Sequence, residues 1–133
     1  MKRATGFSLI ELMIVVMIVG VLLGISVPAY QGYVMRSHRT DAHSSLLDIA
    51  ARQERFVAQR NSYTTEIAAA TGLNLGSANS KDGYYTLAAA ACAGGIANCY
   101  LITATAAGNQ VNDTDCIAIT YDSAGSKAPA DCW

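Results

Sequence analysis

Apolar residues are concentrated in one run near the start of the chain. No charged residue lies between Glu11 and Arg36, and almost every position from Leu12 to Ala29 is apolar or glycine. Because an α-helix rises about 1.5 Å per residue, a run of this length can cross the hydrocarbon core of a bilayer. A single span in lipid must be helical to satisfy its own backbone hydrogen bonds. The basic pair Lys2 and Arg3 predicts that the N-terminus stays cytoplasmic and that the C-terminus crosses the membrane.

The pattern changes after this run. From Tyr30 to about Arg60, apolar residues recur at three- and four-residue spacings with charged residues between them, which is typical of a helix with one buried face. We therefore expect one continuous helix from Phe7 to about Arg60, apolar all round in its first half and amphipathic in its second. The expected buried stripe consists of Ala42, Leu46, Ile49, Ala50, Gln53, Phe56 and Val57.

Three residues are weak points of the predicted helix: Gly20, Gly24 and Pro28. Proline lacks a backbone N–H, and its ring clashes with the carbonyl four residues earlier, which here belongs to Gly24. We expect either an ordinary proline kink or local unwinding between Gly20 and Pro28.

The rest of the chain predicts a small antiparallel sheet that follows a connecting loop. Residues 61–83 form the connection, in which Thr64 or Thr65 can cap a short helix over residues 66–71. Alternating segments bounded by turn residues predict strands at Tyr84–Ala90, Tyr100–Ala106 and Asp115–Tyr121, with Lys127–Trp133 returning toward the sheet. A sheet lying on the helix stripe buries both apolar faces, which gives an α+β fold.

All four cysteines lie in the last third of the chain. An even number of cysteines in a small exported domain favours disulfides, and four cysteines allow three pairings. We favour Cys92–Cys99, within the first hairpin, and Cys116–Cys132, because each closes a local loop. The spacing lacks the paired C-x₂₋₄-C arrangement of a zinc site, so we expect no metal.

Catalytic chemistry finds no support in the sequence. It has no glycine-rich phosphate loop, no H-E-x-x-H and no G-x-S-x-G motif, so we expect neither an enzyme nor a cofactor. His38 and His43 are five residues apart on the predicted helix and point in different directions, and we interpret them as solvated surface residues. Asp113 and Asp115 lie in a polar loop, but two acids are fewer than a calcium loop usually contains.

Arg52, Arg55 and Lys127 are the candidates for a basic, DNA-binding patch. A nonspecific DNA site needs clustered Lys and Arg with aromatic residues nearby. Glu54 interrupts the run, and the formal net charge of the chain is −1. A solvated, salt-bridged helix face is therefore the favoured interpretation, and DNA is a less favoured partner.

Glu11 is the one acid inside the apolar run. A carboxylate at bilayer depth is costly unless it is paired, and it indicates function by default. Cleavage after Gly6 would give Phe7 a new α-amine one helical turn from Glu11, which could neutralise the acid in the same chain or in a neighbouring one. The alternative is a favourable interaction of the acid with the helix dipole. An ordinary cleaved secretory signal is not favoured, because the apolar core is too long and no convincing small-x-small site follows it.

The segment Gly6-Phe7-Ser8-Leu9-Ile10-Glu11, with a basic leader before it and Pro28 after it, resembles the prepilin motif of the type IV pilin superfamily. The resemblance implies that a dedicated peptidase cuts after Gly6 on the cytoplasmic side and methylates Phe7, and that the apolar helix is kept as the filament core. It gives a leader at residues 1–6, a transmembrane and filament-core helix half at residues 7–29, and a globular pilin domain at residues 30–133. That domain divides into a helix half (30–60), an αβ-loop (61–83) and a sheet with a C-terminal disulfide loop (84–133).

A second resemblance is to the PilE-type minor pilins of the type IVa pilus. It is carried by Arg36-Ser37-His38-Arg39-Thr40, Ala51-Arg52-Gln53-Glu54-Arg55-Phe56, Tyr63-Thr64 and Asp131-Cys132-Trp133. It implies a minor structural subunit that takes part in pilus assembly, adhesion and twitching motility. It also makes the Cys116–Cys132 loop the variable D-region of that family, whereas it implies nothing for Cys92–Cys99.

The resemblance also implies partners and a location. The partners are other major and minor pilins, the prepilin peptidase and the inner-membrane platform that assembles the pilus. The precursor is expected in the bacterial inner membrane and the processed chain in a surface pilus, with the globular domain first periplasmic and then extracellular. Removing Lys2 and Arg3 with the leader leaves seven basic residues against ten acidic ones.

Two other functions remain open on the sequence. The chain could be a major pilin or a type II secretion pseudopilin, which abundance in sheared filaments and a secretion defect would reveal. It could instead be a membrane-anchored module that binds DNA or a surface and does not polymerise, in which case replacing Glu11 would leave its function intact.

Overall fold

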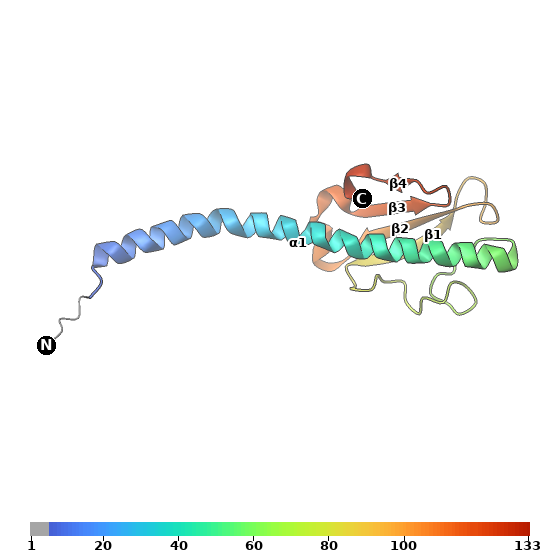
Figure 1. Ribbon diagram of the computed structural model, residues 1–133, viewed down its shortest axis with the longest axis horizontal. Helices are drawn as coiled ribbons and strands as arrows, with labels where there is room; N and C mark the ends of the chain where they lie inside the picture. Colours follow the sequence, from blue (N-terminus) through green and yellow to red (C-terminus); the bar gives the residue numbers. More distant parts are fainter. Residues whose placement is uncertain (1–5) are drawn as a thin grey trace. The chain divides into compact units, whose positions relative to one another are not determined.

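The computed structural model describes residues 6–133, and Figure 1 shows its helix and strands. The contacts divide the chain into two compact units, with the boundary between Val34 and Met35. Helix α1 (Leu9–Arg60) contributes its first half to the first unit and its second half to the second unit. Lys2, Arg3 and the other residues of the predicted leader before Gly6 lie outside the described residues.

Helix α1 contains 52 residues and ends where the sequence predicts. It begins at Leu9, two residues later than expected, and Ser8 directly precedes it. At its end, Asn61 has a left-handed backbone with φ of 54°, and its N–H donates to the carbonyl of Val57 at 2.8 Å. Asparagine tolerates this conformation better than most residues, and it turns the chain out of the helix.

The helix is continuous through Gly20, Gly24 and Pro28. The isolated chain therefore does not unwind between Gly20 and Pro28, and a proline kink stays a prediction. The physical reason is that one proline removes a single N–H donor, while the turns on either side keep their hydrogen bonds. Unwinding inside a filament, where neighbouring helices would shelter the freed backbone groups, stays a prediction.

The second unit contains a four-stranded sheet in the order β1-β2-β3-β4, with every neighbouring pair antiparallel. The strands are β1 (Tyr85–Ala91), β2 (Tyr100–Ala106), β3 (Ala118–Asp122) and β4 (Lys127–Ala128). The predictions for β1 and β2 are confirmed to within one residue, and so is the return of the chain after residue 127. The strand predicted from Asp115 begins three residues later, because residues 114–116 form a 3₁₀ turn.

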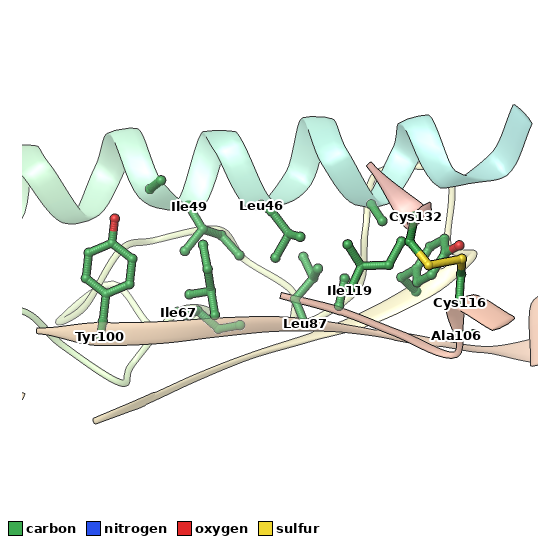
Figure 2. Close-up of a cluster of buried hydrophobic side chains, with 14 of the residues drawn as sticks. Leu46, Ile49, Ile67, Leu87, Tyr100, Ala106, Cys116, Ile119 and Cys132 are labelled. Atoms are coloured by element: carbon green, nitrogen blue, oxygen red, sulfur yellow. A yellow bond between two sulfur atoms is a disulfide. The ribbon is translucent and has the colours of Figure 1, made fainter. Parts of the chain in front are cut away.

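The buried face of α1 packs on this sheet, as Figure 2 shows. Leu46 and Ile49 are completely buried and lie in one cluster with Leu87, Tyr100 and Ile119. Burying a large apolar side chain contributes about 1.5–3 kcal/mol to stability. The predicted stripe is confirmed, with Ala42, Leu46, Ile49, Ala50 and Gln53 buried and Phe56 and Val57 half-buried.

The loop between α1 and β1 contains no helix at residues 66–71, so that prediction is wrong. The carbonyls of Glu66 and Ile67 accept the N–H groups of Leu73 and Leu75, at 2.8 and 3.0 Å. The loop folds back on itself, and these carbonyls are therefore not available for a local helix. Thr64 still accepts the N–H of Glu66 on its hydroxyl at 3.0 Å, but as a turn and not as a helix start.

Both favoured disulfides are present, Cys92–Cys99 and Cys116–Cys132. The first spans the connection between β1 and β2. The second joins the 3₁₀ turn before β3 to the 3₁₀ turn after β4, and both of its cysteines are buried in the core.

Candidate functional site

Ser8 caps the start of α1. Its carbonyl accepts the first helical hydrogen bond from the N–H of Leu12 at 3.2 Å, and its hydroxyl accepts the N–H of Glu11 at 3.2 Å. In return, the N–H of Ser8 donates to Oε2 of Glu11 at 3.4 Å. This reciprocal pair is a capping box, in which two helix-end donors are satisfied by two side chains. Gly6 and Phe7 precede it in a non-helical conformation.

The sequence pattern placed Glu11 in the first helical turn, but Ser8 was missed. The signal was available, because Ser-x-x-Glu before an apolar run is a mark of a helix start. The expected pairing of Glu11 with a Phe7 amine stays a prediction, since that amine does not exist while Gly6 is attached. The carboxylate of Glu11 is within one turn of that future amine and contacts Ser8 in the meantime.

The apolar side chains of the first half of α1 are all exposed in the isolated chain. No residue of its most apolar window is buried. The helix is thus long and apolar enough to cross a membrane. Its exposed apolar residues after Phe7 include Leu9, Ile10, Leu12, Met13, Ile14, Val15, Val16, Met17, Ile18, Val19, Val21, Leu22, Leu23, Ile25 and Val27. Such a surface needs a cover of lipid or of other helices.

Polar contacts hold the second half of α1 against the domain. Arg39 makes a bidentate ion pair with Asp113, with Nη2 at 2.7 Å from Oδ1 and Nε at 2.8 Å from Oδ2. Only 8% of the Asp113 side chain is exposed. The hydrogen bond from Arg39 to this carboxylate raises the pKa of the guanidinium, against the opposing effect of burial. We call the set Arg39, His38, Gln110 and Asp113 the polar clamp.

Gln110 is the centre of the polar clamp. Its amide nitrogen donates to the carbonyl of Met35 at 3.0 Å and to Oδ2 of Asp113 at 3.1 Å. Its amide oxygen lies 3.0 Å from Nδ1 of His38, so that His38 is the donor in this contact. The amide also contacts the hydroxyl of Tyr85 at 3.1 Å, and burial raises the pKa of Tyr85. No sequence pattern pointed to Gln110, because most of its partners are more than twenty residues away along the chain.

Two further buried polar residues of α1 bind the connecting loop. Asp41 accepts the hydroxyl of Ser80 at 2.5 Å and the N–H of Asp82 at 3.2 Å. Gln53 donates to the carbonyl of Thr64 at 2.5 Å and accepts the N–H of Thr64 at 3.1 Å. These contacts give the two buried side chains hydrogen-bond partners and tie the connecting loop to α1.

The interpretation of His38 and His43 as solvated surface residues is wrong, because both are half-buried. His38 stacks on Tyr84 with the ring centres 3.6 Å apart. His43 stacks on Trp133 at 4.6 Å and contacts the carbonyl of Cys132 at 2.6 Å. The segments that return to α1 from the sheet region cover both imidazoles, and this tertiary packing was not visible in the helix periodicity.

The three candidates for a basic patch have different surroundings. Arg52 binds Asp48 one turn away at 3.0 Å and the carbonyls of Leu73 and Asn74, as the salt-bridged interpretation predicts. Arg55 is exposed and donates to the carbonyl of Ala51. Lys127 lies over the ring of Trp133, with its ammonium 4.5 Å from the ring centre.

Two further ionisable groups, both in the sheet region, have shifted pKa values. Burial raises the pKa of Tyr100 to about 12. At the β3–β4 turn, backbone hydrogen bonds from Ser126 above all lower the pKa of Asp122. Oδ1 of Asp122 accepts the N–H groups of Ala124 and Ser126 at 2.9 and 2.8 Å.

The start of the chain has a family match of its own. Residues 1–27 match the prokaryotic N-terminal methylation motif. The chain is 60% identical over 37 residues to the fimbrial protein EcpC of Eikenella corrodens, which is 28% of this chain and 24% of that protein. It is 48% identical over 46 residues to the type IV major alpha-pilin of Moraxella bovis, or 35% of this chain and 29% of that one. The matched segments thus span less than a third of each of these relatives.

The domain has its own matches. A solved structure of a type IV pilin from Shewanella oneidensis has the same fold, with a TM-score of 0.54 at 21% identity over 74% of this chain and 97% of that one. Residues 28–120 match the family described as type IV minor pilin ComP, DNA uptake sequence receptor. Because this match covers more than half of the chain and joins the methylation motif that precedes it, the chain is a type IV pilin and belongs to the ComP family.

Proposed function

We propose that this protein is a minor pilin, a structural subunit of a type IV pilus that is cleaved after Gly6 and methylated on Phe7. The observation that carries the proposal is the first half of α1, which exposes apolar side chains on all sides and contains one acid, Glu11. Such a helix is unsuited to water and suited to two covers in turn, first lipid and then the helices of other pilins.

Before assembly, the apolar half holds the precursor in the inner membrane. The globular domain is then on the periplasmic side, because the basic leader favours the cytoplasm. The partners at this stage are the prepilin peptidase and the assembly platform of the inner membrane.

During assembly, Glu11 is the residue that makes the contact specific. Once the leader is removed, the amine of Phe7 and the carboxylate of Glu11 are opposite charges in an apolar environment. There the Coulomb attraction between them is much stronger than in water. Leaving either charge without a partner would be costly, so the pair favours one position of each subunit along the filament axis relative to its neighbour. Adhesion and twitching motility would follow from membership of the filament.

Mass spectrometry of sheared pili tests this proposal. We expect the chain in the pili at low abundance relative to the main subunit, beginning with N-methylated Phe7. An exported chain that keeps its leader would overturn the proposal. High abundance would instead make it a major pilin, and a secretion defect with normal motility would make it a pseudopilin.

DNA binding by the globular domain is a second candidate function, and the description of the matched family favours it. The exposed Lys127 with the half-exposed Trp133 beside it is the feature of the domain that best fits DNA, since a cation next to an aromatic ring can contact a phosphate and a base or sugar together. The excess of acids over bases makes purely electrostatic binding unfavourable.

Fluorescence anisotropy with labelled duplex DNA and the full chain in detergent tests this second function. Lys127→Gln should weaken binding and lower the slope of log affinity against log salt by about one. Lys81→Gln removes the same charge from the connecting loop and is the matched control, with affinity close to wild type. Equal effects of the two substitutions would show a general charge effect and no site at Lys127.

A further inference from the structure

We propose that Ser8 is a positioning residue for removal of the leader. Its capping box starts α1 at Leu9 and so keeps the Gly6–Phe7 peptide bond outside the helix and open to a peptidase. The inference rests on the proposed function, because it concerns the same cleavage. It goes further by assigning a role to a residue that lies outside the Gly6, Phe7 and Glu11 set.

The capping box fixes the start of α1 at one defined residue. Ser8 contributes its carbonyl to the helix, to the N–H of Leu12, while its hydroxyl and its N–H are both engaged with Glu11. A residue in this position has a non-helical backbone. The helix therefore does not continue back through Phe7, and Gly6 and Phe7 are both non-helical.

The bond to be cut is accessible. The side chain of Phe7 is 84% exposed, and a Cβ placed on Gly6 would find no atom within 4 Å. Peptide bonds are cut most readily where the backbone is exposed and its N–H and C=O groups are not used in the protein. Gly6 and Phe7 meet this condition within the described residues, whereas the N–H and C=O of Ser8 are both engaged in the capping box.

Without the cap, the start of the helix would no longer be fixed. The nearest upstream residues of types that cap helices are Gly6 and Thr5, and a helix capped by Gly6 would already take Phe7 into its first turn. A helix that began after Thr5 would take Gly6 and Phe7 into its first turn and coil the bond that the peptidase must bind. Only the fraction of chains with the bond extended would then bind productively, and the apparent affinity would fall by that fraction.

The length of the apolar half places this bond outside the hydrocarbon. Tyr30 and Tyr33 are exposed and end the apolar run, and tyrosines are enriched at membrane–water interfaces. From Tyr30 back to Glu11 the helix measures about 29 Å, close to the thickness of the hydrocarbon core. With Tyr30 at one interface, Glu11 and the capping box lie at the other, and Gly6–Phe7 lies in water beyond it.

The test is the kinetics of leader removal from the full chain in phospholipid vesicles by a prepilin peptidase. Ser8→Ala should raise KM about fivefold with little change in kcat, since loss of an N-cap corresponds to about 1 kcal/mol. Ser8→Thr keeps a capping hydroxyl and should restore KM to near the wild-type value. Ser26→Ala, the same change within the apolar helix, is the matched control and should leave both constants unaltered.

Two results overturn the inference separately from the function. If wild type is cleaved and Ser8→Ala is cleaved with the same KM, Ser8 has no positioning role and the proposed function stands. If Ser8→Thr is as impaired as Ser8→Ala, the side chain acts by some property other than capping, and the inference fails. If wild type itself is not cleaved, the proposed function fails first and the inference fails with it. Amide hydrogen exchange at Ile10 should be slower in Ser8→Ala than in wild type, because a helix that begins further upstream gives this N–H the carbonyl of Gly6 as an intrahelical acceptor. That result would link the change in KM to the position of the helix start.

Discussion

The two halves of α1 are one helix with two different surfaces. From Leu9 to Val34 the surface is mostly apolar, with Glu11 as its one charged residue, and no side chain of its most apolar window is buried. From Met35 to Arg60 the helix buries one stripe against the sheet and fixes it with buried polar residues, Asp41 and Gln53 among them. The second half is thus specified by contacts within the chain, whereas the first half stays exposed and its apolar surface suits a cover of lipid or of other helices.

The largest expected effect comes from removing core volume in the second half. Leu46→Ala should lower the free energy of unfolding by about 2–5 kcal/mol, because it leaves a cavity under a side chain that is fully buried. Leu22→Ala is the matched change in the first half and should leave it within about 0.5 kcal/mol. Guanidinium unfolding of the full chain in detergent, followed by Trp133 fluorescence, measures both. A comparable loss in both variants would break the contrast between the halves.

A smaller loss is expected from the polar clamp. Asp113→Ala leaves the guanidinium of Arg39 half-enclosed without its bidentate partner, and should lower the free energy of unfolding by about 2–3 kcal/mol. Arg39→Met in the same background removes the orphaned charge and should recover part of the loss. No recovery in this double-mutant cycle would mean that the two side chains do not act as a pair.

The tyrosine at the core predicts how stability changes at high pH. Tyr100 has a folded pKa of about 12, against an ordinary value of 10.0. A raised pKa favours the neutral form, so this contribution is complete below pH 10 and is lost between about pH 10 and 12. Tyr100→Phe should therefore flatten the decline of the unfolding midpoint over this range. An unchanged slope would show that Tyr100 ionises as readily in the fold as in the unfolded chain.

The smallest effect concerns the turn that leads into β4. The pKa of Asp122 is lowered in the fold, so its stabilising contribution is present above its ordinary pKa near 4 and is lost as the pH falls through the lower folded value. Asp122→Asn should lower the melting temperature slightly at pH 7. The difference from wild type should vanish below that folded pKa. A difference that persists in acid would have a cause other than the charge.

Sequence patterns predicted what depends on local chemistry. The three-and-four spacing located the stripe of α1, the alternation located β1 and β2, and the local spacing of the cysteines agreed with both disulfides. The Gly6–Glu11 motif by itself indicated the pilin family, and the match of residues 1–27 to the methylation motif confirms it.

Patterns failed where distant segments meet. The polar clamp joins Arg39 to Asp113 across more than seventy residues, and no spacing rule connects them. His38 and His43 looked solvated because the helix pattern does not show that Tyr84 and Trp133 return to stack on them. The short helix at residues 66–71 failed for the same reason, since Leu73 and Leu75 take the carbonyls that it would have used.

The central claim is that the charge of Glu11 serves contacts between chains and not the fold of its own chain. Glu11→Gln is the most direct test, because glutamine can still complete the capping box with Ser8 while the charge is lost. The measurement is the ratio of this subunit in sheared pili to that left in the membrane, for variant and wild type. We expect the ratio to fall at least about tenfold, because the buried amine of Phe7 is left unpaired, while leader cleavage and the unfolding midpoint stay unchanged. Incorporation at the wild-type ratio would contradict it.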